Sequence, residues 1–327
     1  MGLDGSSRVI GIDIGGTFAR GMRGALVDGT PSLIARKEGI TPQTSQEELV
    51  EAVTTMAGRL ADLARRDGLP ASAVGVAVPG LVDETTGVVH ACPNVKLREF
   101  GLGDYLQERL KLPVFLTHDA RAGALAEYSA GAGRGVSDLL LVAMGVGVGS
   151  AFVSGGRVLR GAHGAAGEIG HISIDPAGML CGCGGRGCVE TFASETSIAR
   201  RYTMAAKEAI LAEEVIARAT AGNPAAVRVW NDALGALATV LATAVALVDC
   251  DLVVLSGTMG IPSEALAPLE ALLAKRINLV RLPRVAVGAL GGDAAALGAA
   301  VVAFERSGLG HPSVDWRASA RLPVGLA

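Results

Sequence analysis

The 327-residue sequence has few aromatic residues, few charged residues and only five cysteines. Aromatic residues make up 3% of the chain, which leaves little material for the stacking platforms that bind single-stranded nucleic acid. Charged residues make up 19%, and the formal net charge is -3, so no basic surface for a polyanion is indicated. The composition therefore excludes nucleic acid as an expected partner.

The sequence also lacks an uncharged apolar run of the roughly 20 residues that span a bilayer. The longest helix-like run, residues 233–248, ends at Asp249 and is expected to be a buried helix. The first residues, MGLDGS, match a myristoylation pattern that is too short to be specific, and they lack the basic start and apolar segment of a secretion signal. We expect no membrane association and a cytoplasmic location, where cysteines stay reduced.

Half of the residues are hydrophobic and the mean hydropathy is +0.42, which is typical of a folded chain. The length exceeds what one hydrophobic core usually serves, so two domains or two lobes are expected. Segments that begin at Arg8 and Asp138 share a pattern of strand, glycine turn and strand, which suggests two related halves. The alternation of strands and helices indicates an α/β fold.

Periodicity places further elements along the chain. Helices are expected at residues 45–67, 120–130, 196–220, 224–248 and 263–275. Strands are expected at residues 73–78, 114–117, 252–255 and 285–287. From about Ser307 the chain is rich in Gly, Pro and Arg and is expected to be a surface tail or linker.

The first glycine turn, DIGGT, runs from Asp13 to Thr17 at the end of an expected strand. Gly15 and Gly16 are able to adopt positive φ, and their backbone N–H groups can line a phosphate. Asp13 can hold a magnesium ion through water, and Thr17 adds a hydroxyl. An ordinary Gly-Gly hairpin explains this motif equally well when it is taken alone.

The second glycine turn, MGVGVGS from Met144 to Ser150, contains Gly145 and Gly147. The sequence has no GxxxxGK[ST] motif, so a P-loop is excluded. A dinucleotide-binding fingerprint needs a helix directly after its glycines, whereas AFVSGGRV continues here as strand and turn. A dehydrogenase is therefore not expected.

Asp119 follows an expected strand and precedes an alanine-rich helix. Aspartate is a good helix N-cap, so a capping role is one interpretation. A carboxylate at a strand-to-helix junction beside a cleft is also where a general base would lie. The residues around Asp119 leave both interpretations open.

Three of the cysteines lie in one turn-rich stretch, residues 168–190. His171, Cys181, Cys183 and Cys188 offer one imidazole and three thiolates, a set that fits tetrahedral zinc with no open position. Because LCGCGGRGC contains few hydrophobic residues, a structural metal is expected to order it in place of a core.

Two carboxylates, Glu168 and Glu190, flank this zinc loop. Zinc is expected to prefer the available sulfur and nitrogen ligands, so both carboxylates stay available for another partner. Carboxylates held in this way favour a polyhydroxylated ligand.

Together these motifs resemble the ROK family of sugar kinases, within the actin-like and hexokinase-like ATPase superfamily. The family's CxCGxxGCxE appears as CGCGGRGCVE, its ExGH as EIGH, its DxGGT as DIGGT and its GDxxxLGAA as GDAAALGAA. The resemblance runs from about residue 9 to residue 300. It implies an α/β, two-lobed actin-like or hexokinase-like (ribonuclease H-like) ATPase fold with a structural zinc loop.

The resemblance implies ATP-dependent phosphorylation of the 6-hydroxyl of a hexose, with Mg²⁺ and a structural Zn²⁺. Asp119 matches the family's catalytic base. The implied sugar-binding residues are Glu168, His171 and Glu190, and His171 binds zinc through one ring nitrogen and a sugar hydroxyl through the other. The implied phosphate and nucleotide positions are Asp13, Gly15, Gly16, Thr17, Gly145, Gly147 and Gly257, the last within VVLSGTMG.

Three positions depart from the family pattern. Phe18 replaces a common lysine, Val146 a common threonine, and His118 the usual asparagine, which is thought to contact the sugar near O3 and O4. A neutral imidazole together with Glu168 can accept hydrogen bonds from an ammonium group at C3. The sugar candidates are therefore 3-amino-3-deoxyglucose (kanosamine), a substrate of some ROK relatives, and plain glucose.

Two lobes are expected to close around sugar and nucleotide, the small-molecule partners. The smaller N-terminal α/β lobe is expected to span residues 1–118, joined by the C-terminal segment from about residue 303. The larger α/β lobe, with the zinc loop, is expected to span residues 119–302. We expect a homo-oligomer, either a dimer or a tetramer.

Two other functions are compatible with a ROK sequence. ROK regulators carry a winged helix ahead of DxGGT, whereas only twelve residues precede Asp13 here. A catalytically weak sugar-binding protein would explain His118 and Val146, but the presence of Asp119 argues against it.

Overall fold

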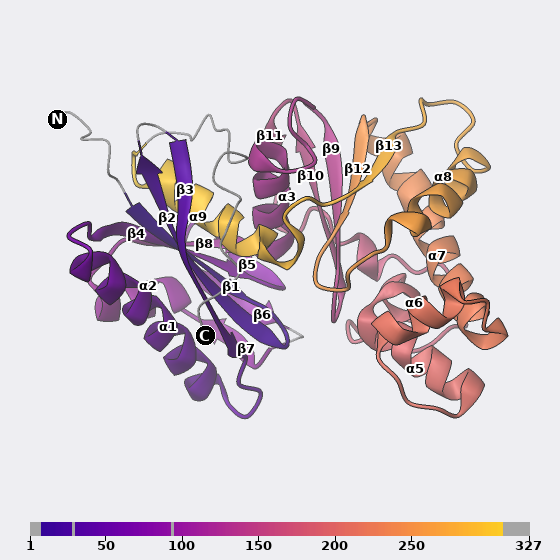
Figure 1. Ribbon diagram of the computed structural model, residues 1–327, viewed down its shortest axis with the longest axis horizontal. Helices are drawn as coiled ribbons and strands as arrows, with labels where there is room; N and C mark the ends of the chain where they lie inside the picture. The colour runs from indigo at the N-terminus through magenta and orange to yellow at the C-terminus, as the bar shows by residue number, and fades with distance from the viewer. Residues whose placement is uncertain (1–7, 28–29, 93–94, 310–327) are drawn as a thin grey trace. The chain divides into compact units, whose positions relative to one another are not determined.

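The computed structural model describes residues 8–27, 30–92 and 95–309 (Figure 1). The chain divides into two compact units. The first unit comprises Met1–Arg134, Arg160–Gly164 and Asp293–Ala327, and the second comprises Gly135–Leu159 and Ala165–Gly292. The N-terminal MGLDGS and the expected tail beyond residue 309 lie outside the described residues.

A five-stranded sheet with the order β3-β2-β1-β4-β8 forms the centre of the first unit. Its strands are β1 (Arg8–Ile14), β2 (Phe18–Val27), β3 (Thr30–Ile40), β4 (Ala71–Val78) and β8 (Val114–His118). β1, β2 and β3 are antiparallel neighbours, whereas β1, β4 and β8 run parallel. The carboxyl ends of β1 and β8 therefore lie at the same edge of the sheet.

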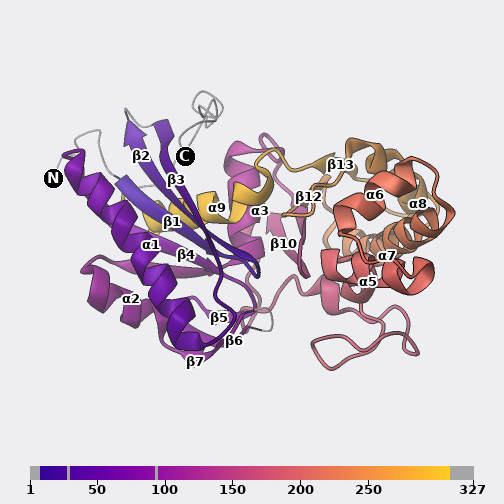
Figure 2. The same ribbon diagram turned by 60° about the horizontal axis from the view of Figure 1, so that its bottom comes forward.

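Helices cover both faces of this sheet (Figure 2). They are α1 (Gln46–Arg66), α2 (Leu102–Leu110), α3 (Asp119–Ala130) and α9 (Ala294–Arg306). Because side chains alternate along a strand, Ile10 and Ile12 of β1 belong to the core that α1 and α2 complete. Val9, on the other face, packs in a cluster with Ala300 and Phe304 of α9.

The last helix, α9, approaches its neighbours closely because glycine leaves room at the crossing points. A Cβ on Gly75 of β4 would lie 1.9 Å from the Ala299 carbonyl oxygen. A Cβ on Gly298 would lie 1.8 Å from the carbonyl oxygen of Ala122 in α3. A larger side chain at either position would push the backbones apart.

A small antiparallel sheet, order β5-β6-β7, completes the first unit. It consists of β5 (Leu81–Asp83), β6 (Val88–Cys92) and β7 (Leu97–Phe100). Val82, Val89 and Leu97 belong to the same core as α1. Sequence periodicity did not predict this sheet, because its strands are short and only partly buried.

The sheet of the second unit has the order β11-β10-β9-β12-β13. Its strands are β9 (Leu139–Met144), β10 (Val148–Ser154), β11 (Arg157–Val158), β12 (Leu252–Ser256) and β13 (Arg284–Val287). As in the first unit, an antiparallel hairpin is followed by parallel strands beside its first member. This shared strand order confirms the internal repeat that the two glycine turns predicted.

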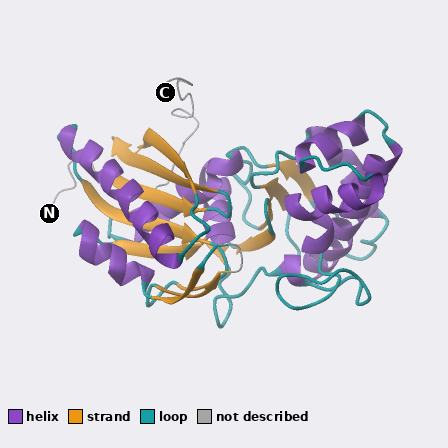
Figure 3. Cartoon of the chain, turned by 90° about the horizontal axis from the view of Figure 1, so that it is seen from below, coloured by secondary structure: helices purple, strands orange, loops and turns teal. Residues whose placement is uncertain are grey.

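Helices pack on one face of the second sheet (Figure 3). They are α4 (Glu190–Ala193), α5 (Glu195–Ala206), α6 (Ala212–Thr220), α7 (Pro224–Val248) and α8 (Leu266–Ala274). By length and composition alone, α7 could cross a membrane. Leu237, Leu241 and Val245 of α7 are buried in the core of the second unit, which accounts for its apolar composition.

The α/β fold class is confirmed, and most expected elements occur close to the expected positions. The single helix expected at residues 196–220 is wrong: α5 ends where Lys207 adopts a left-handed φ of 60°, and α6 begins five residues later at Ala212. The two units also divide the chain differently from the expected boundaries at residues 118/119 and 302/303. Both α3 and α9 belong to the first unit, where they pack against each other.

Candidate functional site

Two of the expected site features, the DIGGT turn and Asp119, lie at one edge of the first unit's sheet. β1 ends at Ile14, directly after Asp13, and β8 ends at His118, directly before Asp119. Both strands pair in parallel with β4, Asp13 opposite Ala77 and His118 opposite Val78. The first phosphate motif and the expected base therefore share the carboxyl edge of the parallel strands, where α/β proteins commonly bind ligands.

Hydrogen bonds with residues beyond the motif hold the DIGGT turn in place. The Gly15 N–H donates to the Phe18 carbonyl at 3.1 Å. Thr41 Oγ1 donates to the Gly15 carbonyl at 2.7 Å, and Gln43 Nε2 donates to the Gly16 carbonyl at 2.6 Å. These bonds give the turn a defined shape before any phosphate arrives.

The turn does not use the ability of its two glycines to adopt positive φ, since neither Gly15 nor Gly16, both described, is among the residues with positive φ. Gly15 is needed for a different reason. A Cβ there would lie 2.5 Å from the Phe18 carbonyl oxygen, so only glycine allows the turn to close.

Asp13 is a buried carboxyl group, 6% exposed, next to other carboxylates. Burial, and then the charge of Asp119, raise its pKa to about 8, against the opposing effect of Arg20, and Asp293 raises it further. A carboxylate that is costly to ionise alone is stabilised by a cation. The site therefore fits the magnesium ion that a phosphate-binding turn would need.

Asp119 is the first residue of α3, and the cap position before the helix belongs to His118. The N-cap interpretation of Asp119 is therefore wrong. Asp119 Oδ1 accepts the Ala120 N–H at 2.6 Å and lies 3.4 Å from His118 Nδ1. The Asp119 side chain is 34% exposed and that of His118 is 5% exposed, so the carboxylate is accessible beside a buried imidazole.

In the second unit, the glycine turn between β9 and β10 is tied to the zinc loop by Glu190. The Gly145 N–H donates to the Gly147 carbonyl at 3.0 Å and closes the turn. The Val148 N–H donates to Glu190 Oε2 at 3.0 Å. Glu190 Oε1 lies 3.6 Å from Cys181 Sγ. One carboxylate thus links the turn to the cysteine cluster.

Gly257, in the expected adenosine-side motif, lies next to the end of β9. Its φ is +105°, and a Cβ would lie 2.3 Å from the Met144 carbonyl oxygen. The Met259 N–H donates to that same carbonyl at 3.1 Å. The loop after β12 can therefore follow β9 closely only with glycine at this position.

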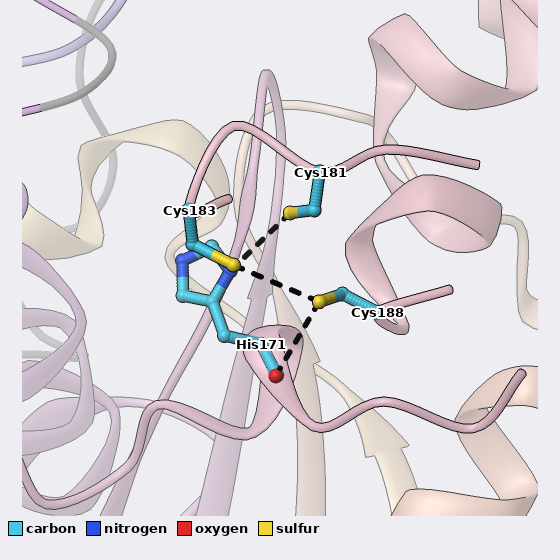
Figure 4. A group of neighbouring side chains, drawn as sticks. All are labelled: His171, Cys181, Cys183 and Cys188. Atoms are coloured by element: carbon cyan, nitrogen blue, oxygen red, sulfur yellow. Dashed lines mark hydrogen bonds between the residues drawn. The ribbon is translucent and has the colours of Figure 1, made fainter. Parts of the chain in front are cut away.

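The four expected zinc ligands converge (Figure 4). The ligand atoms of His171, Cys181, Cys183 and Cys188 all lie within 4.8 Å of one another. Cys183 Sγ is 3.7 Å from Cys188 Sγ, and Cys181 Sγ is 3.6 Å from His171 Nδ1. Ligands about 2.0 to 2.3 Å from one tetrahedral zinc ion have similar spacings, so this set fits zinc.

The thiols of the cluster have unequal acidities. Burial raises the pKa of Cys181 to about 12 and also raises that of Cys188, whereas a hydrogen bond from the Gly185 N–H lowers that of Cys183. Thiolate ligands therefore require a compensating cation here, and zinc binding would release protons.

The other ring nitrogen of His171 faces Glu168. Nε2 lies 3.9 Å from Glu168 Oε2, with the two side chains 28% and 40% exposed. The two nitrogens of one imidazole thus face different groups, Nδ1 the sulfur cluster and Nε2 an exposed carboxylate. Such a partner fixes the orientation of a metal-binding histidine.

Sequence reasoning missed two residues beside Asp119, Glu84 and Arg121. Their side chains are 8% and 2% exposed and lie 3.0 Å apart. A buried charged pair 37 positions apart leaves no periodic signal in the sequence. Only a charge inside an alanine-rich segment, as at Arg121, hinted at an interior partner.

Comparison with known proteins identifies the family of this chain. Residues 9–306 match the ROK family. The chain is 35% identical to a glucokinase from Halalkalibacterium halodurans, over 69% of this chain and 74% of that protein. It is 35% identical to an N-acetylmannosamine kinase from Citrobacter koseri, over 90% of this chain and 98% of that protein. An N-acetylglucosamine repressor from Escherichia coli is 36% identical, over 54% of this chain and 43% of the repressor.

Solved structures agree with this fold. The ROK hexokinase from Thermus thermophilus matches with a TM-score of 0.78 and 33% identity, over 93% of this chain and 100% of that one. A ROK family glucokinase from Streptomyces griseus, in complex with glucose and AMPPNP, matches with a TM-score of 0.77 and 28% identity, over 91% of this chain and 100% of that one. With its paired sheets, glycine turns and Cys₃His cluster, the chain belongs to the ROK family.

Proposed function

We propose that the protein transfers the γ-phosphoryl group of ATP to the 6-hydroxyl of a hexose. The observation that carries this proposal is the accessible Asp119 carboxylate at the same sheet edge as the DIGGT turn and buried Asp13. A base beside a phosphate-binding turn is the arrangement that phosphoryl transfer to a hydroxyl requires.

In this proposal, Asp119 accepts the proton of the sugar hydroxyl while the oxygen attacks the γ-phosphorus and ADP leaves. Backbone N–H groups of the turns at Gly15–Thr17 and Gly145–Gly147 bind phosphate oxygens. Asp13 would hold Mg²⁺ through water, and that ion supplies positive charge to the phosphates.

The zinc loop has a positioning role in the same proposal. His171, Cys181, Cys183 and Cys188 would hold a structural zinc ion with no open position. The contacts of Glu168 with His171 and of Glu190 with the loop support a role for these three residues in binding sugar hydroxyls.

A match over the full length of a kinase supports the kinase. The alignment with the N-acetylmannosamine kinase includes 98% of that protein at 35% identity. A catalytically weak sugar-binding protein is the second candidate, and the assay below separates the two.

The decisive test is turnover of Asp119→Asn with ATP and a panel of hexoses and aminohexoses. Loss of a general base usually costs about a hundredfold to ten-thousandfold in kcat. Asp104→Asn, in the first turn of α2, is the matched control and should keep wild-type kcat. If the wild type phosphorylated none of these sugars, the kinase proposal would be refuted. Asp119→Asn retaining more than about a tenth of wild-type kcat would refute the base.

The proposal also covers the identity of the sugar. His118 Nδ1 lies 3.4 Å from Asp119 Oδ1. In this proposal the His118 imidazole contacts the sugar where the family commonly has an amide. We propose kanosamine, with glucose as the alternative. A hydrogen bond to an ammonium group is worth about 1.5–3 kcal/mol, or roughly tenfold to a hundredfold in kcat/KM. The preference should reverse in His118→Asn, and a wild type that prefers glucose would remove the aminohexose.

The proposal also includes a cytoplasmic location and a homo-oligomer, either a dimer or a tetramer. The three zinc-ligand cysteines support a reducing compartment, because thiolate ligands must stay unoxidised. Sedimentation of the purified protein measures the assembly, and a monomer at all concentrations would contradict it.

A further inference from the structure

A buried ion pair lies next to the junction that carries Asp119. Glu84 directly follows β5, and Arg121 is the third residue of α3. Arg121 Nε donates to Glu84 Oε1 at 3.0 Å, and the two side chains are 2% and 8% exposed. The pair therefore ties the small sheet to the first turn of α3, two residues beyond Asp119.

The same carboxylate oxygen also holds the end of β8. Glu84 Oε1 accepts a hydrogen bond from Thr117 Oγ1 at 3.1 Å and another from the His118 N–H at 3.2 Å. Its donors thus come from both sides of Asp119, two from the end of β8 and one from α3. Hydrogen bonds to a charged acceptor are about twice as strong as neutral ones. Glu84 therefore restrains the backbone before and after Asp119.

Glu84 keeps its charge despite burial. Burial alone would raise its pKa, but Arg121, Arg160 and the His118 N–H outweigh burial and lower the pKa of Glu84. Arg160 Nε lies 3.1 Å from Glu84 Oε2, and its side chain is 59% exposed. Glu84, which accepts hydrogen bonds from residues on both sides of Asp119, is therefore an ionised carboxylate at neutral pH.

Arg121 extends the network to the Arg160–Gly164 segment of the first unit. Arg121 Nη1 donates to the Gly164 carbonyl at 2.8 Å. Arg306 Nη1, from α9, donates to the Glu84 backbone carbonyl at 2.8 Å. The end of β5, the β8–α3 junction, the Arg160–Gly164 segment and α9 all meet at this pair.

We propose that Glu84 and Arg121 are positioning residues for Asp119, which set the place and direction of its carboxylate without contacting substrate. The inference rests on the proposed role of Asp119 as the general base. A base must reach its proton within about 2.6–3.2 Å. A misplacement of about 1 Å can cost roughly a hundredfold in rate. Disturbing the pair should therefore lower kcat and leave nucleotide binding unchanged.

Glu84→Gln tests the charge, because it keeps the size and one acceptor oxygen. Glu84→Gln also leaves the buried Arg121 cation without its ion-pair partner. Combining Glu84→Gln with Arg121→Gln gives a neutral pair that avoids this unpaired charge. We expect kcat to fall about tenfold to a hundredfold in both variants, with KM for ATP within about twofold of wild type. Arg121→Lys keeps the charge but loses the guanidinium group, and it should lower kcat severalfold. This variant tests the inference if the other two variants do not fold.

Glu127→Gln is the matched control for loss of a buried carboxylate. Glu127 lies near the other end of α3, is fully buried, and accepts the Ala132 N–H at 2.8 Å. Its loss should lower Tm while kcat stays within about twofold of wild type. An equal fall in kcat for Glu127→Gln and the neutral pair would show that kcat follows helix stability, and would overturn the inference.

A double-mutant cycle with Asp119→Asn separates positioning from other effects. If Glu84 acts through Asp119, Glu84→Gln lowers kcat in the wild-type background and has little further effect on Asp119→Asn. The same fold-change in both backgrounds, or wild-type kcat in the neutral pair, would refute positioning while the base assignment stands. Near-normal kcat in Asp119→Asn would instead refute the base assignment and the proposed function.

Discussion

Replacing Asp13 by asparagine removes a carboxyl group that the folded chain can ionise only at a cost. Asp13 is 6% exposed, and burial and then the neighbouring Asp119 raise its pKa to about 8. Between about pH 4 and 8, the folded chain therefore keeps a proton on Asp13 that the unfolded chain releases. By linkage, the free energy of unfolding decreases as the pH rises through this window, and Asp13 adds no further slope above it.

The size of the effect follows from the pKa. One pKa unit corresponds to about 1.36 kcal/mol, and about 3.2 units separate the ordinary pKa of 3.8 from pH 7. Asp13 thus costs the folded chain up to about 4 kcal/mol at pH 7 and almost nothing at pH 4. Asp13→Asn should recover much of this cost at pH 7 in protein freed of magnesium and nucleotide.

Thermal unfolding between pH 4 and 8 in the presence of a chelator measures the effect. We expect Asp13→Asn to be several degrees more stable than wild type at pH 7, with the difference vanishing near pH 4. Asp62→Asn, at a side chain 56% exposed in α1, should show no such trend. Added Mg²⁺ and ATP should stabilise wild type but not Asp13→Asn. Parallel pH curves for wild type and Asp13→Asn would refute the reasoning.

Three further variants test other parts of the structure. Cys188→Ser should reduce the zinc content from one ion per chain to near zero and lower Tm, as elemental analysis and calorimetry would show. Gly298→Ala should destabilise the protein by about 1–3 kcal/mol in denaturant titration, because its Cβ would lie 1.8 Å from the Ala122 carbonyl oxygen. Asn223→Ala should cost about 1 kcal/mol, because the Asn223 side chain accepts the Ala225 and Ala226 N–H groups at the start of α7.

Each of these variants has a matched control. Cys250→Ala, at a buried cysteine outside the cluster, should keep its zinc, and equal zinc loss in both variants would contradict the ligand assignment. Gly235→Ala, in α7 with open space around its Cβ, should stabilise by up to about 1 kcal/mol, so a stable Gly298→Ala would contradict the close helix approach. Asn223→Asp should keep the cap, and an unchanged Asn223→Ala would show that the cap is unimportant.

The sequence predicted the parts of the site that depend on local chemistry. The spacing of His171, Cys181, Cys183 and Cys188 predicted a cluster that the fold indeed brings together. The strand patterns around Asp13 and before Asp119 predicted that both lie at strand ends, and parallel pairing through β4 then places them at one edge. Local pattern was sufficient because each motif occupies one turn or one strand end.

Other features depend on contacts between distant segments, which a single sequence does not reveal. Glu84, Thr117 and Arg121 meet across three segments, so their network had no local signal. The helix α9 was visible in the sequence only as a glycine- and alanine-rich motif. Its small residues allow close approach to β4 and α3, which is a contact between distant segments. The break at Lys207 was missed because lysine seldom adopts a left-handed conformation.

The return of α9 to the first unit has a consequence for biosynthesis. β1 and β4 leave the ribosome before the second unit, but the helix that covers Val9 and Ala73 on one face of their sheet is made after it. Until then, that sheet face is exposed to water as an apolar surface, which favours chaperone binding or aggregation. The second unit, with all of its residues between Gly135 and Gly292, can complete its core sooner. Nascent chains should therefore fold from the middle outward, and a chain stalled just before Asp293 should be protease-resistant in the second unit alone.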